Sequence, residues 1–159
     1  MPQCSRFDIK ESKWQDIANL QDARYLGFGD GMNGRIFIAG GCGNCTNVLR
    51  SCEVYNVKTD EWHFIASLSA PRCFGNMVSV DETLYVLCGS LRNSGPHAEW
   101  TVECYDYEKD EWIVKKRIPF RKLVWMWYAL KACSFRLFKG ALHNLESVDC
   151  DKQLSEILL

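Results

Sequence analysis

The sequence lacks the features that mark membrane and secreted proteins. No segment approaches the roughly 18 consecutive apolar residues that a membrane helix needs; the best candidate, residues 123–130, is followed at once by Lys131. The first eight residues contain no apolar core of a secretory signal. We therefore expect no membrane association and a cytoplasmic or nuclear location, where the nine cysteines are mostly free thiols.

An excess of charge of one sign is also missing. The chain has 19 Lys and Arg against 20 Asp and Glu, a net charge of -1. Binding to a phosphate backbone requires a basic surface, and the one basic cluster, within residues 115–122, is short enough to be an ordinary solvated face. We expect no nucleic-acid partner.

Patterns typical of catalysis or cofactor binding are scarce as well. The three histidines are scattered, and no nucleophile elbow or Ser/His/Asp order is present. Cys42 and Cys45 form a CxxC motif, which is either a redox or zinc-binding pair or two cysteines in a loop, and no second CxxC accompanies it. The glycines of residues 27–31 lack the Lys-Ser/Thr of a phosphate-binding loop. We expect no enzyme activity, metal or cofactor.

Aromatic residues, in contrast, are abundant: they make up 13% of the chain and include six tryptophans. Aromatic side chains favour the pleated, half-buried surfaces of sheets, so the composition favours β structure. Three of the tryptophans, Trp14, Trp62 and Trp112, are 48 and 50 residues apart. This spacing predicts an internal repeat.

Other positions keep the same phase. An aromatic residue stands seven positions before each of these tryptophans, and a basic residue stands ten positions after; these are Phe7, Tyr55 and Tyr105, and Arg24, Arg72 and Lys122. The apolar runs 36–39 and 84–87 begin 22 positions after the first two tryptophans and lead into Gly40 and Gly41 in one copy and Gly89 in the other. A repeat of this length and content is typical of a four-stranded propeller blade.

Each copy is interpreted as four strands. The first strands are residues 28–32, which are Gly-rich and therefore poor strand formers, and residues 76–80. The second strands are the apolar runs, which suit burial on both faces; the third are 53–57 and 101–105; the outer ones begin at Trp62 and Trp112. Asn33-Gly34 and Asp81-Glu82 are predicted hairpin turns between the first two strands of each copy.

Residues 36–41, 53–56, 60–62 and 70–72 resemble kelch repeats, in particular those of the BTB-kelch (kelch-like) family, and the resemblance covers roughly residues 4–122. It implies an all-β fold, a partial kelch β-propeller with about two complete four-stranded blades and partial flanking blades. We assign residues 1–122 to kelch repeats and 123–159 to a divergent C-terminal tail, either a partial blade or a segment with a weak helix. Propellers have four to eight blades, so we expect the chain to be marginally stable alone, or a fragment or isoform of a longer protein.

Most repeated residues are expected to be scaffold. Gly40, Gly41 and Gly89 would allow close backbone approach, whereas aromatic residues fill the space between blades; these are Tyr55, Trp62, Tyr105 and Trp112. Because Cys88 replaces one glycine of the pair, strain or a wider fit is expected there.

The resemblance implies a protein-interaction module without a cofactor, binding a protein substrate or peptide for a cullin-RING ubiquitin ligase. The cullin would be contacted only through BTB and BACK segments that this chain does not include. Two alternatives stay open, an actin or cytoskeleton-binding protein and an isoform that does neither. Candidate contacts in the loops are Asn44, Arg50, Arg92, Asn93 and His97. Arg24 and Arg72 follow the repeat phase, and a binding and a structural role are both considered for them.

Overall fold

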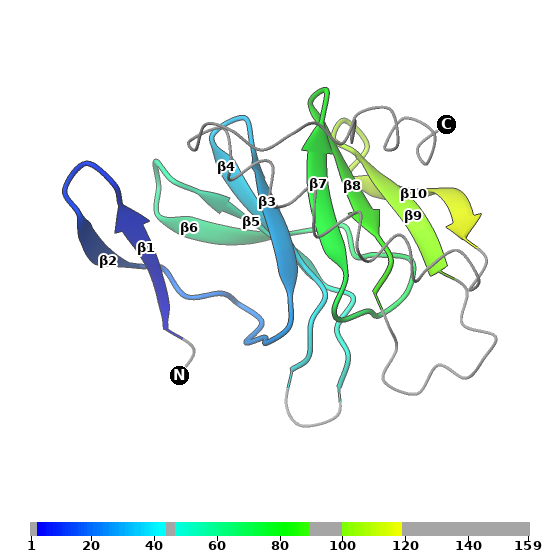
Figure 1. Ribbon diagram of the computed structural model, residues 1–159, viewed down its shortest axis with the longest axis horizontal. Coiled ribbons are helices and arrows are strands. Elements are labelled where there is room, and N and C mark those ends of the chain that lie inside the picture. The colour runs from blue at the N-terminus through cyan, green and yellow to red at the C-terminus, as the bar shows by residue number, and fades with distance from the viewer. Residues whose placement is uncertain (1–2, 44–46, 90–99, 119–159) are drawn as a thin grey trace, which may run out of the picture.

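The computed structural model describes residues 3–43, 47–89 and 100–118, and these form three antiparallel sheets (Figure 1). The first sheet pairs β1 (Cys4–Asp8) with β2 (Lys13–Ile17). The second contains β3 (Phe28–Met32), β4 (Arg35–Ala39), β5 (Cys52–Asn56) and β6 (Glu61–Ile65). The third contains β7 (Asn76–Val80), β8 (Thr83–Leu87), β9 (Trp100–Asp106) and β10 (Glu111–Ile118).

Both four-stranded sheets are meanders in which consecutive strands are neighbours, with orders β3-β4-β5-β6 and β7-β8-β9-β10. β3 lies against β7, so the two first strands are adjacent, and the β1–β2 hairpin lies beside β6 (Figure 1). The four strands expected in each copy are therefore present, and β1 and β2 correspond to the third and outer strands of a preceding copy. This is the arrangement of two propeller blades and the outer half of another.

The Gly-rich segment expected to be a poor strand former is the regular strand β3. Phe28 and Met32 are buried at its two ends, and this burial outweighs the weak propensity of the glycines. A Cβ atom on Gly29 would lie 2.3 Å from the carbonyl oxygen of Phe37 on β4, so this position has no room for a side chain.

The first two strands of each blade are joined by two-residue turns at the predicted positions. Asn33 and Gly34 have φ values of 51° and 69°. Asp81 and Glu82, with 46° and 59°, adopt the same left-handed conformation without a glycine. Two positive φ values in succession define the type I′ turn, whose twist matches that of the flanking strands.

The core lies between the two four-stranded sheets. Side chains from both sheets and from the linker between them meet there: Phe28, Met32, Phe37, Ala39, Cys52, Val54, Leu68, Met77, Leu84, Val86 and Tyr105. The expectation that residues 36–39 are buried on both faces is wrong for Ile36, which is 40% exposed. The sheet on that side has only two strands in the described chain, so it leaves part of β4 uncovered.

The repeat tryptophans occupy equivalent positions in their hairpins, but their side chains differ in burial. The ring centroids of Tyr55 and Trp62 lie 5.0 Å apart, and Trp62 is 9% exposed. Phe7 and Trp14 make the same cross-strand pair at 5.4 Å, yet Trp14 is 70% exposed. A neighbouring blade therefore determines whether the aromatic pair is buried.

Lys115, Lys116 and Arg117, from the basic cluster noted in the sequence, are exposed on the outer strand β10. Charged residues on an outer strand oppose pairing with other chains. The expected tail, residues 123–159, lies outside the described residues. No helix within the described ranges is long and apolar enough to cross a membrane.

Candidate interaction site

The longer connections gather at one end of the sheets, opposite the short hairpin turns (Figure 1). They are the β4–β5 connection, residues 40–51, the β8–β9 connection, and two linkers, residues 18–27 and 66–75, that lead into β3 and β7. We call this the loop end and the opposite side the turn end. Residues 44–46 and 90–99 within these connections are outside the described part of the chain.

Backbone hydrogen bonds join the loops of the two blades. The N–H of Gly41 donates to the carbonyl of Arg72 (2.8 Å), and the N–H of Arg72 donates to the carbonyl of Leu49 (3.0 Å). The N–H of Leu68 donates to the carbonyl of Arg50 (2.9 Å). The β4–β5 connection and the linker after β6 are thus held as one framework.

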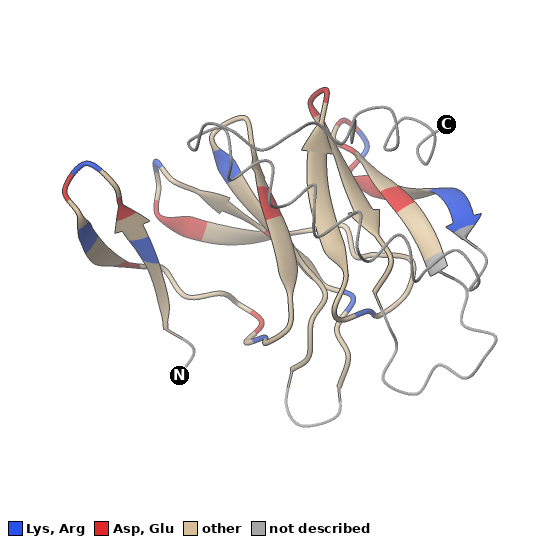
Figure 2. Cartoon of the chain, in the orientation of Figure 1, with Lys and Arg blue, Asp and Glu red and all other residues tan. Residues whose placement is uncertain are grey.

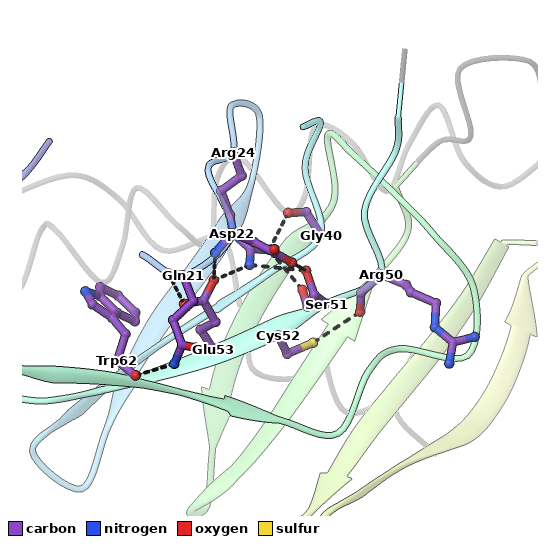
Figure 3. A network of polar contacts seen from close by, with 9 residues as sticks. All are labelled: Gln21, Asp22, Arg24, Gly40, Arg50, Ser51, Cys52, Glu53 and Trp62. Atoms are coloured by element: carbon purple, nitrogen blue, oxygen red, sulfur yellow. Dashed lines mark hydrogen bonds and ion pairs between the residues drawn. The ribbon is translucent and has the colours of Figure 1, made fainter. Parts of the chain in front are cut away.

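A buried ion pair fixes the linker that precedes β3 (Figure 3). Nη2 of Arg24 lies 2.5 Å from Oε1 of Glu53 on β5, and both side chains are at most 1% exposed. The Glu53 carboxylate also accepts hydrogen bonds from the backbone N–H groups of Gln21 (2.8 Å) and Asp22 (3.1 Å). Nη1 of Arg24 donates to the carbonyls of Gly40 (2.8 Å) and Ser51 (2.9 Å).

The second blade repeats this network. Arg72 pairs with Glu103 on β9, and the two side chains are 6% and 0% exposed. Glu103 accepts hydrogen bonds from the backbone N–H (2.9 Å) and hydroxyl (2.8 Å) of Ser69, and Nη1 of Arg72 donates to the carbonyl of Cys88 (3.0 Å). Burial lowers the pKa of Arg72, and the charge of Glu103 opposes this shift.

The glycine positions end the second strands in a left-handed conformation. Gly40 has φ 56° and Gly41 φ 95°; Cys88 has φ 59° and Gly89 φ 95°. Cys88 thus adopts the backbone of Gly40 with a side chain, which is the strain expected from the missing glycine. A Cβ on Gly40 would lie 2.3 Å from the carbonyl oxygen of Arg72, so only glycine fits where the next blade approaches.

A third repeated contact attaches each linker to the outer strand. The hydroxyl of Tyr55 (2.7 Å) and the N–H of Ala18 (2.9 Å) donate to Oδ1 of Asp60, and the indole of Trp62 donates to the carbonyl of Ala18 (2.9 Å). The N–H of Ala18 and the Tyr55 hydroxyl lower the pKa of Asp60. Burial and the Asp60 hydrogen bond raise the pKa of Tyr55.

The second copy contains the same contact. The hydroxyl of Tyr105 (2.6 Å) and the N–H of Ala66 (2.7 Å) donate to Asp110, and the indole of Trp112 donates to the carbonyl of Ala66 (2.9 Å). Burial, followed by the hydrogen bond to Asp110, raises the pKa of Tyr105.

The candidate contact residues differ in exposure, and some of them lie outside the described part of the chain. Arg50 is exposed in the β4–β5 connection. The guanidinium groups of Arg24 and Arg72 lie in the buried ion pairs, which favours the structural one of the two roles considered for them. The remaining candidates lie outside the described residues: Asn44, Arg92, Asn93 and His97.

Sequence reasoning overlooked the carboxylates that hold this framework. Glu53 and Glu103 each stand nine positions before the repeat tryptophan, and Asp60 and Asp110 stand two positions before it. A charged residue at the same phase of two repeats, within or beside an apolar strand, is the signal that could have identified them.

The Sγ of Cys52 donates a long hydrogen bond to the carbonyl of Arg50 (3.7 Å). Cys42 of the CxxC motif is buried, and Cys45 is outside the described residues. Burial raises the pKa of Cys52 to about 12 and that of Cys88 to about 11. Within the described ranges, no group of three or more His, Cys, Asp and Glu residues is placed to hold a metal ion.

Comparisons with known proteins agree with the repeat. The kelch motif family model matches residues 31–69. The chain is 31% identical to Kelch-like protein 41a of Danio rerio over 52% of its length and 36% identical to F-box/kelch-repeat protein At1g67480 of Arabidopsis thaliana over 53%. It is 27% identical to Beta-scruin of Limulus polyphemus over 76%. The matched parts cover only 14%, 22% and 14% of these relatives.

The fold is similar to that in the solved structure of YjhT, with a TM-score of 0.59 and 16% identity, over 70% of this chain and 44% of the other. Four-stranded meanders, a blade-length repeat and the kelch motif match all describe the same architecture. We conclude that the chain contains a kelch motif over residues 31–69 and that its four-stranded sheets are blades of a partial β-propeller, a type of module that generally binds proteins.

Proposed function

We propose that the chain recognises a protein partner through its loop end and serves as the substrate-recognition part of a ubiquitin ligase, in the cytoplasm or nucleus. The observation that carries the proposal is the continuous backbone framework at this end. Hydrogen bonds through Gly41, Arg72 and Leu49 fix loops of two blades relative to each other, while nearby side chains stay exposed. Loops positioned by a rigid scaffold are well suited to recognition.

The groups with shifted pKa values have structural roles, and this supports a binding function over a catalytic one. The pKa values of Tyr55, Asp60 and Arg72 are shifted by burial and by contacts that hold the linkers in place. Cys52 and Cys88 are buried thiols whose raised pKa values disfavour the reactive thiolate. Each shift thus has a structural explanation within the blades.

The ligase part of the proposal is supported by the relatives. The matches to Kelch-like protein 41a and to F-box/kelch-repeat protein At1g67480 fit the role that the resemblance to kelch-like proteins implies. Because the chain covers a small part of each relative, the cullin contact is assigned to segments outside it.

A cytoskeletal role is the second candidate, because the match to Beta-scruin extends over 76% of the chain. Co-sedimentation of the purified chain with actin filaments, without co-purification of ligase subunits, would favour it over the ligase role.

The test is affinity purification of the full chain from cells after proteasome inhibition, with the loop-end variant Arg50→Glu and the turn-end variant Glu82→Lys in parallel. Both residues are exposed, so neither change disturbs the core. We expect a ubiquitylated protein that is captured by the wild type and by Glu82→Lys but lost with Arg50→Glu. Partners that depend on the turn end, or no partner at all, would refute the proposal.

A further inference from the structure

The two ends of the blades differ in charge. The turn end carries charged residues in its hairpin turns, Asn33-Gly34 excepted (Figure 2); those of the second blade are Asp81, Glu82, Glu108, Lys109 and Asp110. The described connections of the loop end carry four: Asp22, Arg24, Arg50 and Arg72. Two of these, the arginines of the buried ion pairs, are neutralised by Glu53 and Glu103.

The loop end exposes large apolar side chains where described charged residues are few, whereas those of the turn end, Ile9, Val57 and Tyr107, lie in hairpin turns that also carry charged residues. Tyr25 is 48% exposed, Leu26 42% and Phe74 55%. Leu26 and Phe74 stand 48 positions apart, at the same place in successive repeats, and the N–H of Phe74 donates to the carbonyl of Leu26 (3.3 Å). Tyr25 is joined to Cys42 by a pair of backbone hydrogen bonds. The three side chains therefore belong to adjoining segments of one framework.

The backbone at these positions is also unusual. Leu26 has φ 55° and Phe74 φ 56°, values at which bulky side chains are rare and glycine is favoured. The following residues, Gly27 and Gly75, begin the approach to β3 and β7. Bulky apolar residues thus occupy a strained conformation twice, in solvent, where they contribute little to the core. Strain of this kind is concentrated where a side chain has a function.

We propose that Tyr25, Leu26 and Phe74 form an apolar anchor surface that binds an aromatic or aliphatic side chain of an extended peptide segment, and that Arg50, at the same end of the blades, binds a carboxylate of that segment. This inference rests on the proposed function and defines the chemistry of the partner. Apolar anchors in a rigid surface account for most of the binding free energy in many protein interfaces.

The charges of the loop end favour a peptide with both an apolar side chain and a carboxylate. The carboxylate of Asp22 already accepts a hydrogen bond from the hydroxyl of Ser51 (2.6 Å). Arg50 is then the exposed cation of the loop end that has no ion-pair partner among the described residues. Among the described residues of this end, a purely acidic segment would find one such cation, whereas a segment with one apolar side chain and one carboxylate matches both the exposed apolar residues and Arg50.

The test uses the double variant Leu26→Gly/Phe74→Gly. Because glycine favours a positive φ, both changes remove a side chain and relieve the backbone, so the melting temperature should not fall. The matched control is Asp81→Gly/Glu82→Gly, which makes the same kind of change at the turn end, also at positive φ.

The probe is a phage-displayed library of random dodecapeptides, selected against the full chain. The best peptide is then synthesised with a fluorescent label for titration. We expect selected peptides to share an aromatic or aliphatic residue together with Asp or Glu. The Leu26→Gly/Phe74→Gly variant should bind the labelled peptide at least tenfold more weakly, and the control variant should bind like the wild type. Selection against Arg50→Gln should retain the apolar residue and lose the acidic one.

The outcomes separate this inference from the proposed function. Equal binding by the Leu26→Gly/Phe74→Gly variant, or selection of purely acidic peptides, overturns the anchor surface but leaves the loop end as the binding site. If no peptide is enriched but a protein partner is captured through the loop end, the anchor surface is likewise overturned and the loop end remains the binding site. Absence of both kinds of binding overturns both proposals. A lower melting temperature of the glycine variant would contradict the strained conformation on which the inference depends.

Discussion

Arg24 and Glu53 form a buried ion pair although they are 29 residues apart, one in the linker before β3 and the other on β5. The same relationship recurs in the next blade, where Arg72 pairs with Glu103. Each pair binds a linker to the third strand of the blade that the linker enters. The buried ion pair of each blade therefore holds the linkers of the loop end in position.

Removal of one partner of this pair should destabilise the chain strongly. Glu53→Gln leaves the guanidinium of Arg24 buried without a counter-charge, and the expected loss is about 3–5 kcal/mol in the free energy of unfolding. The double variant Arg24→Met/Glu53→Leu removes both charges and should lose less. Urea unfolding followed by tryptophan fluorescence measures both values.

The exposed pair of Lys13 and Glu11 provides the control for this experiment. Glu11→Gln should change the free energy of unfolding by less than about 1 kcal/mol, as is usual for surface ion pairs. A cost of Glu53→Gln as small as that of Glu11→Gln would show that the buried pair does not hold the blade.

The repeat tryptophans should differ in their response to the same substitution. Trp62→Phe removes the indole N–H and leaves the carbonyl of Ala18 without its donor, which should cost about 1–3 kcal/mol. Trp14→Phe, at the equivalent position, changes a side chain that is 70% exposed and should be nearly neutral. Thermal unfolding of the two variants compares them directly, and equal losses would contradict the difference in burial between the two hairpins.

Two glycines with left-handed backbone should respond differently to alanine. A Cβ atom on Gly34 would meet no other atom within 4 Å, so Gly34→Ala should cost only the conformational term of about 1–2 kcal/mol. Gly40→Ala adds a collision with the carbonyl of Arg72, and its total cost should exceed about 3 kcal/mol. Unfolding in urea measures both; a Gly40→Ala variant as stable as Gly34→Ala would exclude the close approach of the blades.

Acid should weaken the attachment of the linkers. The folded pKa of Asp60 is lowered, first by the N–H of Ala18 and then by the hydroxyl of Tyr55. Its contribution to stability is therefore present above the unfolded pKa of about 3.9 and is lost as the pH falls through the lower, folded value. The urea midpoint of the wild type should decline below about pH 4, and Asp60→Asn should show a shallower decline.

The matched control for the pH experiment is Glu82→Gln, which removes an exposed carboxylate from a different turn. It should follow the wild-type profile. If Asp60→Asn also follows it, the hydrogen bonds to Asp60 do not contribute to the stability of the folded chain.

The repeat itself could be predicted from the sequence, because blade-length spacing, turn residues and alternation are local properties. The hairpins at Asn33-Gly34 and Asp81-Glu82, the strands of both blades and the left-handed position of Cys88 all follow from residues close in the chain. Strand β3 and the exposed Ile36 departed from expectation, since burial depends on tertiary neighbours that local propensity does not contain.

The amino-acid sequence by itself determined the phase and the strand order of the two described blades, because each of their strands and turns is encoded by neighbouring residues. The tertiary structure alone decided that Arg24 and Arg72 are internal, that Trp62 is covered while Trp14 is not, and that Leu26 and Phe74 meet at the loop end. These outcomes depend on contacts between segments 29 to 48 residues apart. Whether a charged side chain is buried or an apolar one is exposed is decided only when the blades pack against each other.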